Sequence, residues 1–533
     1  MMQRLLIATI AFAFAGAPAL ADNHGAAVDP LVIALGTPSQ ETNRAWLVPI
    51  FEHVQMEPYL ESLLGNDAQT GETIPSLAER WETNDDRSVW TFTLRQGVQF
   101  HHGWGEFTSA DVVHSHTLWS DPESPMANQR LWAQTEVSAD GPYQVTFRFP
   151  EPQFFGEDLF NRFQTEGFIW SKAQWDAEGV AGIDRLPAGT GPYMYVERAD
   201  GQYIRFAANP DHWSGTTPDF ANIEFRFIPE ESSRYASLVT GAAHIADIPR
   251  ERFPEALADG MVLFASPVAN YQSHLVYGGS HFSETTPEPD MSVPWLADPR
   301  VRRALNHAIN RDEIIEFVYE GLAQPLVASG FQPLQEGWNP QWVADFDEYY
   351  GYDPELAIQL IEEAGYSVSD IRPVFVAPRF PGSEEFPTLI EAIQQQMSSI
   401  GINAEIREMD TATLRAQSVD FGTSGLIIPL RNLPVRRSVV FASTVLGTGT
   451  PWKTYETDEI DELASQWRAT FDPEERQRLA REVGDIVFYQ HAVMPIAELA
   501  RTFVADPAVV DGWSFPGVTS AGLTHFDLIR STR

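Results

Sequence analysis

Three arginines, Arg431, Arg436 and Arg437, lie close together in a chain that is otherwise strongly acidic. The sequence has 35 Lys and Arg against 74 Asp and Glu, which gives a net charge of −39. A guanidinium group is a planar fork of N–H donors that binds a carboxylate or a phosphate at two points. The cluster therefore predicts contact with an anionic ligand, with Arg431 as the first candidate. Ordinary ion pairs with surface carboxylates, which contribute little to stability, are the alternative for all three.

Aromatic side chains give a second set of candidates. Tyr271, His274 and Tyr277 lie in the strand-like segment NYQSHLVYGG, and Trp452 follows a turn rich in Gly and Thr at 447–451. Tyr271 and His274 are three positions apart, so both can line one site only if the strand bends. A lone aromatic side chain more often packs in a core than contacts a ligand. We keep Tyr271, His274 and Trp452 as candidate ligand contacts, with packing as the alternative, and predict packing for Tyr277.

No pattern in the chain predicts catalysis or metal binding. The neighbours His101 and His102 cannot readily chelate one ion, and His114 and His116 do not share a helical face. The chain has no cysteine to complete a thiolate site. It also has no GxSxG, HExxH or P-loop motif. We therefore predict a protein that is not an enzyme and that needs no metal and no cofactor.

The elements that position these residues alternate between strands and helices. The apolar spacing over 77–81 predicts a short amphipathic helix, whereas the alternation over 90–94 predicts a strand. Segments 143–149 and 222–228 show the same strand-like alternation. This interleaving predicts an α/β fold.

Three helix starts are marked by an Asp followed by Pro, at Asp298-Pro299, Asp353-Pro354 and Asp472-Pro473. An Asp side chain accepts hydrogen bonds from the first free N–H groups of a helix, and Pro is well placed at the first helical position. After Asp353, the apolar residues fall on one helical face as far as Gly365. We predict a helix at each of these places.

The first 21 residues have the pattern of a secretion signal. Arg4 precedes an apolar run from Leu5 to Leu20, and Ala19-Leu20-Ala21 is a small-residue cleavage site. A membrane anchor is the alternative, but the run is shorter than a spanning helix needs. The missing cysteine also excludes a lipid anchor built on a Cys after the signal. These features predict a protein that is free in the periplasm, and the net negative charge argues against nucleic acid as a partner.

Five segments, taken in order, resemble the solute-binding proteins of family 5, the oligopeptide, dipeptide and nickel class. The segment GTGPYMYVERADGQYIRFAANPDHW (189–213) is similar to the family's "GTGPY…NPxYW" segment, and 298–323 is similar to its "VRxALxxAIDR" helix. The other three are 223–248, 392–410 and 458–487, and the segment 71–116, which precedes all five, also resembles the family. Together they span most of the chain.

The resemblance implies a bilobal fold of the type II periplasmic-binding-protein kind, with a hinge between the lobes and an extra inserted domain. The expected parts are a signal peptide (1–21), lobe I (22–70, 186–268 and 497–533), the inserted domain (71–185) and lobe II (269–496). The implied mechanism is closure of the lobes around a solute, followed by delivery to the membrane permease of an ABC importer. Separate ATPase subunits are the other implied partners, and the binding protein is expected to be a monomer.

One departure from the family concerns the ligand. Peptide-binding relatives hold the amino terminus of the substrate with an Asp in a "GW…aDYxDPxxFL" segment, for which this chain has 419–441. Asp420 lies at the start of that segment, but the acidic cluster is replaced by the three arginines. We therefore expect a peptide-like or carboxylated small solute. A secreted hydrolase, or a sensory or chaperone-type binding protein without a transporter, are the alternative functions.

Overall fold

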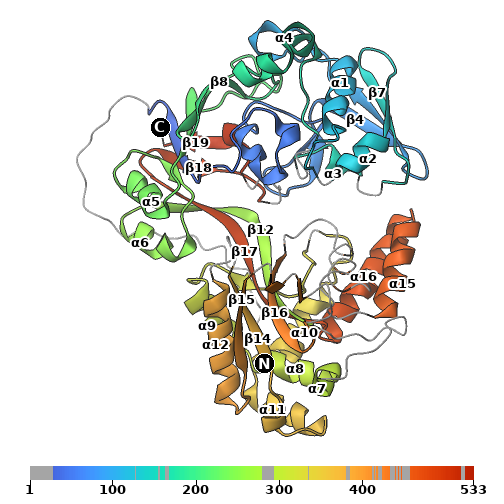
Figure 1. The fold of residues 1–533 in the computed structure, drawn as a ribbon, viewed down its shortest axis with the longest axis vertical. Helices are drawn as coiled ribbons and strands as arrows, with labels where there is room; N and C mark the ends of the chain where they lie inside the picture. Colours follow the sequence, from blue (N-terminus) through green and yellow to red (C-terminus); the bar gives the residue numbers. More distant parts are fainter. Residues whose placement is uncertain are drawn as a thin grey trace.

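One continuous β-sheet runs through both halves of the molecule (Figure 1). The computed structural model describes residues 28–532 apart from 127, 154–155, 163–166, 279–292, 334, 380–384, 411–412, 415, 418–422, 433–438, 440–441, 443–445, 447–456 and 518–522. Within that part of the chain the sheet has eleven strands. Ten follow the order β15 (Glu405–Asp410), β14 (Val374–Arg379), β16 (Leu426–Asn432), β12 (Val262–Tyr277), β17 (Val493–Ala505), β11 (Ile245–Ala246), β1 (Leu31–Leu35), β10 (Asn222–Phe227), β9 (Tyr203–Ala208) and β8 (Tyr193–Ala199). The eleventh, β13 (Gln324–Pro325), pairs with β17.

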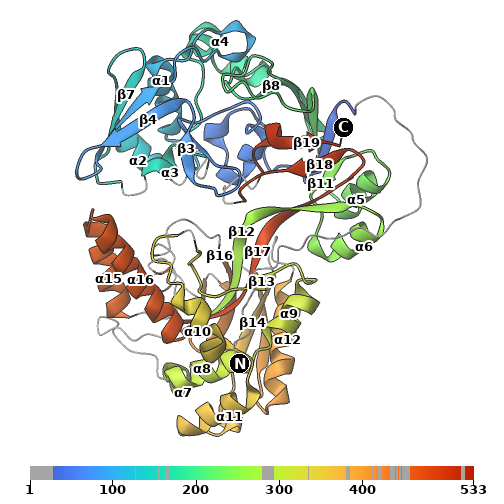
Figure 2. The same ribbon diagram turned by 180° about the vertical axis from the view of Figure 1, so that it is seen from behind.

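Two long strands, β12 and β17, cross between the halves, as Figures 1 and 2 show. They are antiparallel partners from Val262 opposite Ala505 to Val276 opposite Val493. At one end β17 also pairs with β11, and at the other end β12 pairs with β16. We use "lobe I" for the half built on β1 and β8–β11, and "lobe II" for the half built on β14–β16. Each crossing strand therefore belongs to both lobes.

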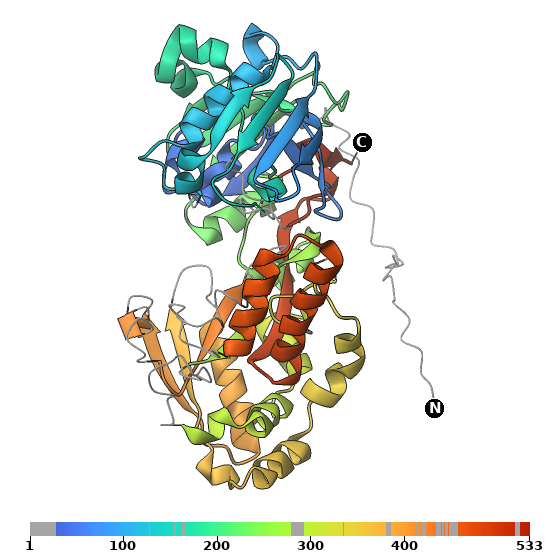
Figure 3. The same cartoon turned by 90° about the vertical axis from the view of Figure 1, so that its right-hand side faces the viewer.

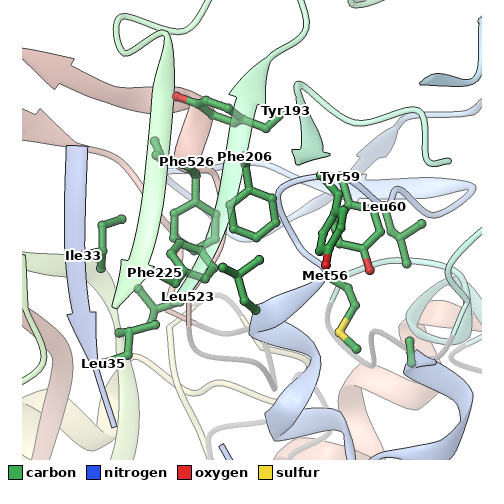
Figure 4. Packing of buried hydrophobic residues seen from close by; sticks show 14 of the residues in the cluster. Ile33, Leu35, Met56, Tyr59, Leu60, Tyr193, Phe206, Phe225, Leu523 and Phe526 are labelled. Atoms are coloured by element: carbon green, nitrogen blue, oxygen red, sulfur yellow. The ribbon is translucent and has the colours of Figure 1, made fainter. Parts of the chain in front are cut away.

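Lobe I is held by an apolar core between its sheet and the returning C-terminal segment. Strands β1, β10 and β11 are parallel neighbours, and α5 (Glu231–Val239) and α6 (Phe253–Ala258) follow β10 and β11. Figure 4 shows Ile33, Tyr59, Phe206 and Phe225 packed together with Phe526. The rings of Phe225 and Phe526 lie 4.9 Å apart, centroid to centroid. Packing of aromatic rings at this distance ties the C-terminal segment to β10.

The segment expected to be the inserted domain contains a separate four-stranded antiparallel sheet with helices against it. Its strand order is β4 (Ala78–Thr83), β5 (Val89–Leu94), β7 (Gln144–Arg148) and β6 (Glu136–Ala139), and α1 (Ser109–Trp119), α2 (Gln129–Gln134) and α4 (Lys172–Arg185) complete it. The strands predicted at 90–94, 143–149 and 222–228 are confirmed as β5, β7 and β10.

The helix predicted over 77–81 is wrong, because these residues form strand β4. Trp81 pairs with Phe92 of β5, and Ala78 pairs with Leu94. Six residues are too few for a helix to be stable by local propensity alone. The ladder with β5 supplies partners for the backbone that a short exposed helix would lack, so tertiary pairing decides the conformation here.

Lobe II surrounds its three strands with helices. They are α7 (Pro294–Ala297), α8 (Pro299–His307), α9 (Arg311–Val318), α10 (Gln341–Tyr350), α11 (Pro354–Glu363), α12 (Phe386–Ser399), α15 (Asp458–Ala469) and α16 (Pro473–Tyr489). In Figure 3 the two red helices, α15 and α16, stand side by side on this lobe. No helix in the described ranges is both long enough and apolar enough to cross a bilayer.

The three predicted helix starts are confirmed. The carboxylate of Asp298 accepts a hydrogen bond from the N–H of Arg300, and that of Asp353 from the N–H of Leu356, both at 2.9 Å. Asp472 accepts from the N–H groups of Glu474 and Glu475 at 2.9 and 3.4 Å. Each cap satisfies donors that have no partner inside the helix.

The two glycines of the GTGPY segment pack directly on the backbone of residues 58–59. The N–H of Gly191 donates to the carbonyl of Tyr59 at 3.0 Å, and the carbonyl of Gly189 accepts from the N–H of His101 at 2.9 Å. A Cβ atom on Gly189 would lie 1.7 Å from the carbonyl oxygen of Tyr59. The hydrogen bond with His101 joins lobe I to the segment 71–185, and the contact with Tyr59 leaves no room for a side chain on Gly189.

We predict that Gly189→Ala lowers the free energy of unfolding by about 1–3 kcal/mol or more, because the new methyl group must displace backbone rather than a flexible side chain. Chemical denaturation followed by circular dichroism measures the loss. Gly512→Ala is the matched control, since its Cβ would find its nearest neighbour at 4.0 Å. Equal stability of the two variants would contradict this explanation of the motif.

Candidate ligand pocket between the lobes

A pocket with a volume of about 260 Å³ lies where lobe I, lobe II and the crossing strands meet. Most of its lining side chains are charged or polar. They are Glu231 and Arg234 of α5, residues 247–251 and Phe253 after β11, Tyr271 of β12, residues 500–502 of β17, Glu385 before α12, and Arg431 of β16. The pocket thus draws walls from both lobes and from both strands that join them.

The position follows from the sheet topology. Glu231 begins the helix after β10, and Asp247 comes directly after β11. In lobe II, Glu385 is the N-cap residue of α12, and Arg431 lies near the end of β16. These residues therefore stand at the carboxyl ends of parallel strands, where open α/β sheets bind their ligands.

Arg431 and Tyr271, which the sequence singles out, are in contact. The guanidinium carbon of Arg431 lies 3.7 Å from the centre of the Tyr271 ring. Strands β12 and β16 bring them together, because Ser273 is opposite Arg431 in the ladder. The hydroxyl of Tyr271 donates to Oε1 of Glu385 at 3.2 Å. Burial, and then the charge of Glu385, raises the pKa of Tyr271, so it stays a neutral donor.

Two further arginines in the pocket are held by the protein itself. Nη2 of Arg501 lies 2.9 Å from Oδ2 of Asp247, which is an ion pair between β17 and lobe I. Arg234 donates from Nε to the carbonyl of Asp247 at 2.6 Å. Its Nη1 donates to the carbonyls of Ile228 and Pro229 at 2.8 and 3.0 Å. These contacts fix the loops after β10 and β11.

Arg250 is held more loosely. Its two Nη atoms donate to the carbonyls of Leu322 and Ala500, both at 3.3 Å. Burial, as the largest cause, lowers the pKa of Arg250, and the nearby charge of Arg431 acts in the same direction, against the effects of Tyr271 and Glu385. The charged form of this guanidinium is therefore less favoured in the pocket than it would be in water.

The other predicted ligand contacts do not join this group. His274 is fully buried, and burial lowers its pKa to about 3, so the ring is neutral at physiological pH. It is absent from the pocket lining in the described part of the chain, although β12 has a register shift between Ser273 and His274. Tyr277 is buried in the core of lobe II, as predicted. Arg436, Arg437, Trp452 and Asp420 lie outside the described residues.

The histidine pairs have structural contacts. A ring nitrogen of His101 lies 2.9 Å from the carbonyl oxygen of Gly191, and one of His116 lies 2.9 Å from that of Trp132. The described ranges contain no group of three or more side chains that could hold a metal ion.

Comparison with known families decides the class of protein. The profile of the bacterial extracellular solute-binding proteins, family 5 Middle, matches residues 72–429. The chain belongs to this family. The resemblance drawn from the five segments is thus confirmed, and so is the α/β architecture of a bilobal binding protein.

Curated relatives of the chain are binding proteins. It is 26% identical to heme-binding protein A of Haemophilus influenzae over 453 residues, which cover 79% of this chain and 78% of that protein. It is 27% identical to the dipeptide-binding protein of Escherichia coli over 475 residues, 82% of each chain.

Solved family 5 structures share the fold. HbpA2 from Haemophilus parasuis superposes with a TM-score of 0.76 at 21% identity, covering 94% of this chain and 99% of that one. A nickel ABC transporter structure from Bacillus halodurans gives a TM-score of 0.77 at 18% identity, with the same coverage.

Sequence reasoning missed Arg250, Asp247, Glu385 and Arg501. The signal for the first two was present in the segment IADIPRERF, where charged residues follow directly on a strand. That signal becomes specific only when the strand is known to be a parallel neighbour of β1. Glu385 and Arg501 come from distant parts of the chain, and only the fold brings them to the pocket.

Glu498 lies on crossing strand β17, opposite Gln272 of β12 and Gln324 of β13. Burial raises the pKa of this carboxyl from its usual 4.5 to about 7. Between these two values the folded chain keeps a proton that the unfolded chain has released. Stability is therefore lost as the pH rises from about 4.5 to 7, and the loss is complete above 7.

We predict that Glu498→Gln, which stays neutral, raises the free energy of unfolding at pH 8 by roughly 1–3 kcal/mol, with a smaller gain at pH 5. Urea denaturation at both pH values measures the difference. Glu391→Gln, at an exposed position of α12, is the control. The same gain at both pH values would show that ionisation of Glu498 is not the cause.

Proposed function

We propose that this family 5 protein is the periplasmic substrate-binding subunit of an ABC importer. It captures a peptide-like or carboxylated small solute by closing its two lobes, and delivers the solute to the permease. Separate ATPase subunits supply the energy, and the binding protein acts as a monomer. The observation that carries the proposal is the charged pocket at the junction of two lobes that the strands β12 and β17 join.

The joint between the lobes supports a hinge. Strand β12 has three register shifts against β17, between Ala265 and Ala269, between Ala269 and Tyr271, and between Ser273 and His274. Bulges bend a strand and interrupt its ladder, so the crossing region resists bending less than a regular sheet would. Hinge closure of this kind is a common way for binding proteins to enclose a ligand.

The pocket chemistry supports a polar solute with at least one negative group. Among the described residues, the lining has side chains of both signs, with four arginines and four acidic residues. Arg431 lies on the face of Tyr271, where the ring holds the guanidinium in place. A pre-positioned guanidinium binds a carboxylate with less loss of entropy than a free one.

The names of relatives support a solute of this size and polarity. They include proteins described as binding dipeptides and glutathione, and a solved structure holds the peptide STSA. Another solved relative is described in complex with agropinic acid. Within the family, then, peptide-like and carboxylated solutes are both represented.

The first test is whether the protein carries and binds a solute without changing it. We expect native mass spectrometry of the purified protein to show a small copurifying solute. After its removal, a panel of dipeptides, glutathione and carboxylated amino-acid conjugates should contain a stabilising member. A ligand at one hundred times its dissociation constant stabilises the folded state by about 2.7 kcal/mol. Chemical turnover of the bound solute, or no stabilisation by any member of the panel, would contradict the proposal.

The second prediction concerns Arg431. Arg431→Ala should weaken binding of the copurifying solute about tenfold or more, because it removes a charged donor that the Tyr271 ring holds over the pocket. Isothermal titration calorimetry measures the change. Arg407→Ala, which removes an exposed arginine paired with Glu405 on β15, is the control. Unchanged affinity in the Arg431 variant would place this residue outside the binding site.

A further inference from the structure

Arg250 differs from the other arginines of the pocket in the hydrogen bonds and ion pairs of its guanidinium group. A guanidinium has five N–H donors. Two hydrogen bonds, both at 3.3 Å, leave three of them without an acceptor among the described residues. No carboxylate in that part of the chain lies within 4.0 Å of Arg250. Glu385 favours the charged form from beyond that distance, and the hydrogen bonds of the guanidinium to described residues are the two long ones to carbonyls.

The other three arginines of the described lining lack this property. Arg501 is neutralised by Asp247 at 2.9 Å. Arg234 has three carbonyl contacts between 2.6 and 3.0 Å, which is close to ideal geometry. Arg431 is exposed and lies on Tyr271. Only in Arg250 are partial burial, long hydrogen bonds and the absence of a described counter-ion combined.

A partly buried cation without a counter-ion carries a free-energy cost. An anion that enters the pocket can remove part of that cost, so its binding gains more at Arg250 than at a guanidinium that is already paired. The four acidic side chains of the lining disfavour a ligand group with two negative charges. A carboxylate, which has one negative charge, therefore suits the charges of this lining better than a phosphate.

We propose that Arg250 is the receptor for a carboxylate group of the bound solute. The inference rests on the proposed function, and it names the chemical group recognised and the residue that recognises it. Arg250 follows β11 of lobe I, yet it donates to Ala500 on a crossing strand and to Leu322, which follows α9 of lobe II. A carboxylate held there lies at the joint itself, where it can influence the relative position of the lobes.

The test uses simple anions at constant ionic strength. Acetate and succinate should raise the melting temperature of the wild-type protein in a concentration-dependent way. Arg250→Gln should weaken this response at least tenfold in apparent affinity. Arg252→Gln should respond as the wild type does. Arg252 is the matched control because it already pairs with Glu255 at 2.8 Å and lies only two residues away. Both variants replace an Arg with a Gln, so they change the net charge of the protein equally.

Three results would overturn the inference. They are no response of the wild type to either carboxylate, an equal response of Arg250→Gln, or a stronger response to inorganic phosphate than to the carboxylates. Circular dichroism without added anion checks the fold of each variant. Should Arg250→Gln not fold, Arg250→Lys replaces it. Lysine keeps the charge but lacks the fork, so a response weaker than that of the wild type is expected, and an equal response counts against the inference.

The copurifying solute separates this inference from the proposed function. If Arg250→Gln retains that solute with wild-type affinity, the protein is still a binding protein and only the role of Arg250 is wrong. If neither protein holds any solute or responds to the panel of peptides and conjugates, the proposed function fails as well.

Discussion

The antiparallel ladder between β12 and β17 is the interaction on which the rest of the structure depends. It is the central part of one sheet, in which β17 pairs with β11 of lobe I at one end and β12 pairs with β16 of lobe II at the other. The lobes are therefore parts of a continuous hydrogen-bonded network, and their separate cores meet at this joint. Because the ladder is interrupted by bulges, it can keep the lobes connected while allowing their angle to change.

The pocket is a consequence of the same ladder. Strands that run toward the joint place their carboxyl ends there, and the residues after those ends are charged. Some of these charged groups are already held by neighbours, as in the Arg501–Asp247 pair and in the contacts of Arg234 with three carbonyls. Some polar groups of the pocket thus hold its walls in position, and others can contact a ligand. Such a division is typical of sites that bind small molecules with few oriented polar contacts.

Much of the local structure could be predicted from the sequence, because local rules govern it. The caps at Asp298 and Asp353 and the alternation over 90–94 depend on neighbouring residues only. The segment 77–81 was predicted wrongly because its conformation is decided by pairing with β5. The site was harder to predict. Contact between Arg431 and Tyr271 depends on the register of β12 against β16. Arg250 differs from the other arginines only in the folded structure, where its guanidinium makes two long hydrogen bonds and no ion pair with a described carboxylate.

Motion of the lobes about β12 and β17 is the central claim, and a distance across the joint tests it most directly. The chain has no cysteine, so spin labels can be placed on Leu257→Cys in α6 and Phe317→Cys in α9 without further changes. Both positions are exposed, at 48% and 76%. Pulsed electron paramagnetic resonance then measures the distance between the labels with the copurifying solute bound and after its removal. Our account predicts two different distance distributions that interconvert with the solute, whereas one unchanged narrow distribution would contradict it.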